Sequence, residues 1–122
     1  IIWLSNIDPY EMAKIYNASD VVISIPNSDS SPASVYEAMF CKKPVIISDL
    51  EWSNEYFKNR KNIFKIKEIN SKELAKEIEH VISSPNKTRI ITENAYKIVK
   101  KFFDYRKNMK KLENIMKMKI KK

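Results

Sequence analysis

Two acidic residues, Asp29 and Glu37, stand eight positions apart around the start of a predicted short helix. Ser31-Pro32 has the form of a helix cap followed by proline at the first helical position, which places Asp29 just before the helix and Glu37 inside it. An ionised carboxylate accepts hydrogen bonds and donates none. We therefore expect these two side chains to accept hydrogen bonds from hydroxyl groups of a ligand.

The start of the same helix offers a site for an anion. The backbone N–H groups of Ala33, Ser34 and Val35 lie in its first turn, where no helical carbonyl is available to them, and they carry the positive end of the helix dipole. Such a terminus favours a phosphate or diphosphate, which the two carboxylates would repel. The combination predicts a ligand with a phosphate group between two hydroxyl-bearing parts.

The elements on either side of this helix form a predicted βαβ unit. An apolar, β-branched run from Val21 to Ile25 comes first, the helix follows at about residues 32–41, and a second apolar run spans Val45 to Ile47. Continuous apolar strands are typical of a parallel sheet that is covered on both faces. Because ligands bind at the carboxyl ends of such strands, residues 26–32 and 48–52 are predicted to lie side by side at the functional edge.

This segment resembles the signature of the GT-B glycosyltransferases of the family 4 type, in their C-terminal nucleotide-sugar-binding domain. The shared features are two acids, an Ala-Met pair after the second acid and a later Pro-Val, here Asp29, Glu37, Ala38-Met39 and Pro44-Val45. The first acid is Asp where the family has Glu, and Lys42 stands where the family has glycine. If that turn needs a left-handed residue, Lys42 adopts the conformation at a cost of roughly 1–2 kcal/mol. The resemblance covers about residues 1–85, and its specific part is 27–49.

The resemblance implies a role for each polar group of this segment. Glu37 would hold the ribose hydroxyls of a nucleotide, and Asp29 would contact the transferred sugar. The backbone amides of Ala33, Ser34 and Val35 would bind the diphosphate.

An earlier turn is implied to lie near the nucleotide base. In the family this turn joins a strand to a helix, and here it contains Asn6 and Ile7. The implied donor is a UDP-sugar or a GDP-sugar, and neither a metal ion nor a cofactor is expected.

The resemblance also implies an enzyme, a glycosyltransferase that retains anomeric configuration and works in a cleft between two domains. The N-terminal acceptor domain is absent from this chain, which begins at Ile1 without an initiator Met, so we expect a piece of a longer protein. The chain alone should bind its donor weakly and catalyse little or nothing. Two alternatives stay open: a non-catalytic, doubly wound module for regulation or assembly, and an epimerase or phosphorylase of the same fold.

Length and composition predict one globular domain. With 122 residues and 43% apolar content, the chain fits an α/β, Rossmann-like fold with a mainly parallel sheet flanked by helices, residues 1–85 forming the core and residues 86–122 C-terminal helices. The absence of glycine excludes a Walker loop and a Gly-x-Gly-x-x-Gly fingerprint. A single cysteine, Cys41, and a single histidine, His80, exclude an internal disulfide and argue against a zinc site or a Cys–His pair.

The other elements are predicted from caps and periodicity. A buried strand is expected at residues 1–4 and a further strand at 62–66, and a short helix is expected to begin within 48–55. Asp8-Pro9 predicts a helix that ends near residue 18, and Asn70 followed by Glu73 predicts another that ends at Pro85. Two further helices are expected at about residues 88–103 and 105–120.

The last predicted helix is amphipathic and basic. Residues 97–122 carry eleven Lys or Arg and two acids, a net charge of +9, whereas residues 1–96 carry −1. Its narrow apolar stripe is formed by Tyr105, Met109, Leu112, Met116 and Ile120. We expect this stripe to pack on the absent acceptor domain; attachment to an anionic membrane surface and a plain solvated face are the alternatives. No nucleic-acid partner is expected, no apolar run approaches the roughly 20 residues that cross a bilayer, and the expected location is the cytoplasm.

Overall fold

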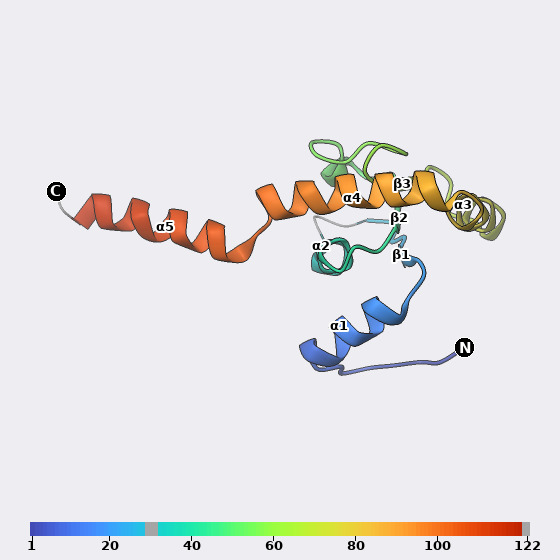
Figure 1. Cartoon of the computed structure of the whole chain (residues 1–122), viewed down its shortest axis with the longest axis horizontal. Helices are drawn as coiled ribbons and strands as arrows, with labels where there is room; N and C mark the ends of the chain where they lie inside the picture. The colour runs from blue at the N-terminus through green and yellow to red at the C-terminus, as the bar shows by residue number, and fades with distance from the viewer. Residues whose placement is uncertain (29–31, 121–122) are drawn as a thin grey trace.

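The computed structural model describes residues 1–28 and 32–120 (Figure 1). Its elements follow in the order α1 (Pro9–Ala18), β1 (Val22–Ser24), α2 (Ala33–Phe40), β2 (Val45–Ser48), the 3₁₀ turn η1 (Glu51–Ser53), β3 (Phe64–Ile66), α3 (Ser71–Ser83), α4 (Pro85–Phe102) and α5 (Tyr105–Ile120). Strands β1, β2 and β3 pair in that order and are parallel. The predicted α/β architecture with a parallel sheet is confirmed.

The sheet is covered on both faces because successive side chains of a strand point to opposite sides. On one face, Val45 and Ile47 of β2 pack with residues of α2 and with the second half of α4. On the other face, Ile46 packs with β3, with Val81 of α3 and with Ile91 of α4. All four residues of β2 are buried, as a central parallel strand requires.

The helix starts predicted from caps are confirmed for α1 and α3. The Asp8 side chain accepts a hydrogen bond from the Tyr10 N–H at 2.8 Å, and the Asn70 side chain accepts one from the Glu73 N–H at 2.8 Å.

Two prolines, Pro32 and Pro85, occupy helix positions that differ from prediction. Pro32 is the N-cap residue of α2 rather than its first helical residue, because its backbone is extended (ψ 126°). The predicted cap Ser31 lies outside the described residues.

The boundary between α3 and α4 also differs from prediction. The sequence predicts that one helix ends at Pro85 and that the next begins near Thr88, whereas Pro85 is the first residue of α4. Proline is accepted at this position because its missing N–H would have no helical acceptor there. The Thr88 N–H accordingly closes the first turn on the Ser84 carbonyl at 2.9 Å.

The predicted strand at residues 1–4 is wrong for this structure. The segment is not paired with the sheet, and its side chains are between 60% and 111% exposed. It runs beside α1 and away from the strands (Figure 1). A strand forms only against a neighbour that satisfies its N–H and C=O groups, and among the described residues no strand lies beside this segment.

Lys42 has the left-handed backbone expected where the family has glycine, with φ 56°. The turn it forms closes α2, since the Lys42 N–H donates to the Met39 carbonyl and the Lys43 N–H donates to the Ala38 carbonyl. The Lys42 ammonium lies 3.5 Å from the Glu93 carboxylate and 4.6 Å from the centre of the Tyr96 ring. These contacts with α4 offset part of the cost of the strained backbone.

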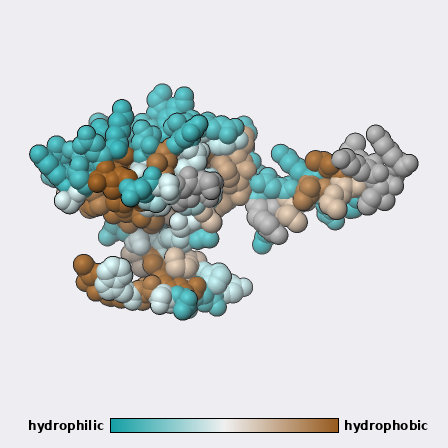
Figure 2. All heavy atoms as spheres, turned by 180° about the vertical axis from the view of Figure 1, so that it is seen from behind, coloured by the Kyte–Doolittle hydropathy of each residue, from teal (hydrophilic) through white to brown (hydrophobic). Residues whose placement is uncertain are grey.

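Helix α5 extends away from the body of the molecule (Figure 1). The side chains of Met109, Leu112, Ile115 and Met116 are between 45% and 55% exposed. Figure 2 shows hydrophobic patches, in brown, beside hydrophilic ones along the projecting helix. Within the described part of the chain, no helix is long and apolar enough to span a bilayer.

Candidate functional site

A pocket of about 420 Å³ lies between α1 and α2. Its lining is mainly apolar and comprises Ile7, Pro9, Met12, Ala13, Tyr16, Glu37, Phe40 and Cys41. Two residues with predicted binding roles, Ile7 and Glu37, therefore face the same space although they lie in different elements. An apolar pocket with few polar groups is typical of a small-molecule site, because the polar groups then orient the ligand.

The Glu37 carboxylate is held by a buried tyrosine. The Tyr16 hydroxyl, from α1, donates a hydrogen bond to Glu37 Oε2 at 3.0 Å. Tyr16 is only 6% exposed, and burial together with the Glu37 carboxylate raises the pKa of its phenol to about 12. The phenol therefore keeps its proton at neutral pH. Within the described residues, no second donor reaches the carboxylate of Glu37.

The amides at the start of α2 divide into two kinds. The Val35 N–H donates to the Pro32 carbonyl at 3.2 Å, and the Val35 side chain is fully buried. Ala33 and Ser34, the first two residues of the helix, are exposed and have no preceding helical carbonyl within α2. Of the three predicted diphosphate amides, the Val35 N–H is thus already hydrogen-bonded at the start of the helix. The N–H groups of Ala33 and Ser34 belong to exposed residues and have no acceptor within α2.

Two other residues, Asp29 and Asn6, also have predicted roles in the site. Asp29, predicted to contact the transferred sugar, lies outside the described residues. Asn6 is exposed and has a left-handed backbone (φ 53°), which asparagine tolerates better than most residues. It precedes Ile7 but is not part of the pocket lining, so only Ile7 of the predicted pair contacts this space.

The loops that follow β1 and β2 are predicted to lie side by side, and their described residues do so. The Ser48 hydroxyl donates to the Pro26 carbonyl at 2.8 Å and so joins the carboxyl ends of the two strands. In the second loop, Asp49 lies 3.6 Å from the Lys65 ammonium. Trp52 packs edge-on against Tyr36, with ring centres 6.1 Å apart, and is therefore part of an aromatic cluster of the core.

Six residues of the pocket have no predicted binding role, and two of them, Tyr16 and Cys41, have side chains that can ionise. The helical spacing of Met12, Ile15 and Tyr16 in the sequence predicts that they pack in the core, which is correct for the ring of Tyr16 but does not predict the partner of its hydroxyl. The available signal was general: a buried tyrosine hydroxyl usually has a hydrogen-bond partner. Cys41 is half-buried, and burial raises the pKa of its thiol, so it remains protonated at neutral pH.

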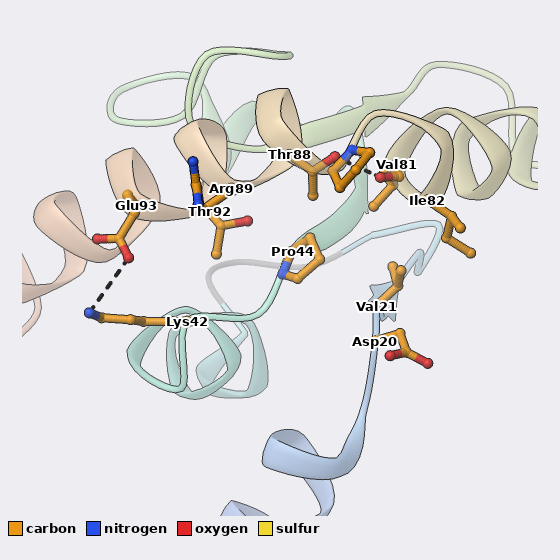
Figure 3. A pocket seen from close by; sticks show the side chains of 11 residues that line it. Asp20, Val21, Lys42, Pro44, Val81, Ile82, Thr88, Arg89, Thr92 and Glu93 are labelled. Carbon is orange, nitrogen blue, oxygen red and sulfur yellow. Dashed lines mark hydrogen bonds and ion pairs between the residues drawn. The ribbon is translucent and has the colours of Figure 1, made fainter.

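A larger pocket, of about 570 Å³, has Val21, Pro44 and residues of α3 and α4 in its lining (Figure 3). Val21 and Pro44 in its lining come directly before β1 and β2, so it is at the amino ends of the strands. Two of its polar groups are already engaged: the Thr88 hydroxyl donates to the Val81 carbonyl at 2.6 Å, and Lys42 pairs with Glu93. Ligands of parallel α/β sheets bind at the carboxyl ends of the strands, which argues against this larger pocket as the donor site.

Residues 1–98 match the model of the family described as glycosyl transferases group 1. The chain belongs to this family. It is also 27% identical over 116 residues to an uncharacterized glycosyltransferase of Methanocaldococcus jannaschii, which covers 94% of the chain and 30% of the relative. The resemblance inferred from the acids and the Ala-Met pair is thereby confirmed. Within the described residues, no three His, Cys, Asp or Glu side chains are grouped as metal ligands would be.

Solved structures share the fold. HepE of Anabaena, in complex with UDP-glucose, matches with a TM-score of 0.77 at 25% identity over 86% of this chain and 29% of that protein. Sucrose-phosphate synthase of Thermosynechococcus elongatus matches with a TM-score of 0.84 at 19% identity, over 96% and 29%. The C-terminal domain of LpcC, a group 1 family protein of Francisella tularensis, matches with a TM-score of 0.73 at 22% identity, over 86% and 53%. The chain thus spans less than a third of the full-length relatives.

Proposed function

We propose that this chain binds the donor nucleotide-sugar of a glycosyltransferase that transfers a sugar from a nucleoside diphosphate to an acceptor with retention of configuration. The observation that carries the proposal is the Glu37 carboxylate, held by Tyr16 at an apolar pocket one helical turn beyond the start of α2. The group 1 family and the UDP-glucose complex of HepE support it.

The proposed pose follows from the spacing along α2. Ala33 and Glu37 are four residues apart, so they lie on the same face of the helix and are separated by about 6 Å along its axis. A ribose and its 5′-phosphate can span that distance, with the ribose hydroxyls on Glu37 and the phosphates at the amides of Ala33 and Ser34. The base would then lie against the apolar lining near Ile7.

The start of α2 also has a role in the proposed reaction. When the bond between the sugar and the diphosphate breaks, the leaving diphosphate gains negative charge. Backbone N–H groups at a helix start stabilise such charge without rearranging, and this stabilisation is greater in the transition state than in the bound donor. We further propose that Asp29 contacts the transferred sugar and that no metal ion takes part.

A ligand titration tests the proposed function. UDP, GDP and ADP are added separately to the ¹⁵N-labelled chain at up to millimolar concentration, with inorganic pyrophosphate as the control for simple anion binding. We expect one nucleoside diphosphate to shift the amide signals of Ile7, Ala33 and Ser34 and to raise the melting temperature, because a ligand that binds only the folded state stabilises it. Silence from all three nucleotides, or an equal response to pyrophosphate, would contradict the proposal.

The second proposed partner is the acceptor-binding part of the same enzyme. The exposed stripe of α5 fits a protein surface, and the full-length relatives are about three times as long as this chain. We expect the chain to remain in the supernatant when mixed with anionic phospholipid vesicles at about 0.15 M salt, where surface charge attraction is strongly screened. Sedimentation with the vesicles that is lost in Leu112→Asp would instead assign the stripe to a membrane.

A further inference from the structure

The hydrogen bond between Tyr16 and Glu37 joins two helices that are distant in sequence. The two residues are 21 positions apart, and the bond links α1 to α2 across the pocket. Figure 1 shows α1 set apart from the sheet, on the side of α2. The phenol is therefore part of both the contact between the helices and the wall of the pocket.

The two ends of this bond lie in different environments. Tyr16 is 6% exposed, so leaving its hydroxyl unpaired would be costly, whereas the Glu37 side chain is at the surface. An exposed glutamate normally samples many rotamers, and holding it in one conformation costs entropy. The bond to a rigid, buried phenol restricts this freedom before any ligand arrives.

The bond also divides the carboxylate into two oxygens with different roles. Oε2 accepts the Tyr16 proton, and Oε1 has no donor among the described residues. We propose that Tyr16 is a positioning residue of the donor site, which holds Glu37 so that Oε1 accepts a hydrogen bond from a ribose hydroxyl. This inference rests on the proposed function.

The arrangement favours ribose over a sugar that lacks these hydroxyls. A carboxylate that is already held in one conformation loses no further side-chain entropy when it accepts a hydrogen bond from the ligand. The hydrogen bond to the ribose hydroxyl therefore contributes more to binding affinity than one to a mobile carboxylate. A ligand without the hydroxyl leaves the held carboxylate without that partner, so it should bind more weakly than the ribonucleotide. If Tyr16 served only to pack the core, its hydroxyl would influence ribose and deoxyribose ligands equally.

The test compares Tyr16→Phe with the wild-type chain, using UDP and GDP and their 2′,3′-dideoxy counterparts. We expect the variant to bind the preferred ribonucleotide about 3- to 10-fold more weakly, the usual range for one hydrogen bond, and the dideoxy ligand with unchanged affinity. Tyr10→Phe is the matched control, because Tyr10 lies on the same helix and is 83% exposed. An equal loss for both ligands would overturn the inference and leave a packing role.

A measurement on the wild-type chain does not depend on how the variant folds. The carboxyl ¹³C signal of Glu37 is expected to move when the ribonucleotide is added and to stay in place with the dideoxy ligand. If the signal moves equally with both, the inference is overturned although the chain binds nucleotides. If the wild-type chain binds neither ligand, the proposed function itself fails and the inference falls with it.

Discussion

Glu37→Ala is expected to weaken binding of the preferred nucleoside diphosphate by about 10- to 100-fold, since hydrogen bonds to a charged group contribute roughly 1.5–3 kcal/mol. The substitution removes the carboxylate that we assign to the ribose. It also leaves the buried Tyr16 hydroxyl without its acceptor. We therefore expect a second effect, a loss of about 1–3 kcal/mol in the free energy of unfolding. Isothermal titration and urea denaturation measure the two effects separately.

Two further variants distinguish loss of the ribose contact from two other effects, a change in the charge of the chain and a loss of folding stability. Glu93→Ala removes another acid near α2, one that lies in α4, pairs with Lys42 at 3.5 Å and does not line the pocket beside Glu37, and it should leave nucleotide affinity unchanged. Glu37→Gln keeps an acceptor for Tyr16 but lowers its charge, so stability should be largely retained while affinity falls. Unchanged nucleotide affinity in Glu37→Ala would remove the basis for the ribose contact.

Phe57→Ala is expected to destabilise the chain by about 3–5 kcal/mol, the usual cost of deleting a buried phenylalanine ring. Phe57 is 2% exposed and lies between elements that are distant in sequence. Its ring centre is 6.2 Å from those of Tyr36 in α2, Trp52 in η1 and Phe103 at the end of α4. Because small domains are stable by only about 5–15 kcal/mol, the variant should lose a large part of its stability.

Urea denaturation followed by circular dichroism measures this loss. Phe102→Ala is the matched control, since Phe102 belongs to the same aromatic group through Tyr56 but is 39% exposed. We expect the control to lose less stability, because a larger share of its ring area stays in contact with water in the folded chain. Equal losses for Phe57→Ala and Phe102→Ala would show that the cluster does not act as a buried core.

The family and the structure favour the donor-domain interpretation over a non-catalytic module. A scaffold needs apolar periodicity, which the βαβ unit has, but it does not need an acid held at a pocket beside a helix start. Glu37 is such an acid, and its partner Tyr16 is buried. The Glu37 and Tyr16 variants together test this distinction. In a donor-binding site both variants weaken the binding of ribonucleotides, and the Tyr16 variant does not weaken the binding of dideoxy ligands, whereas a non-catalytic module would show no such difference.

The sequence by itself determined the features that depend on neighbouring residues. The caps at Asp8 and Asn70 form as predicted because each side chain reaches an N–H only two or three residues ahead. The left-handed turn at Lys42 follows from the resemblance, and the continuous apolar run from Val45 to Ile47 predicts a strand that is covered on both faces, as β2 is. Local geometry and periodicity suffice for such features.

Tertiary structure alone decided which distant groups meet. The segment at residues 1–4 has strand-like composition, yet it remains exposed because pairing depends on a neighbouring strand rather than on its own residues. The Tyr16 hydroxyl reaches Glu37 across 21 residues, and the packing of α1 against α2 makes that contact. Helical spacing placed the Tyr16 ring in the core, but the direction of a hydroxyl at the end of a side chain is set by the three-dimensional position of its acceptor.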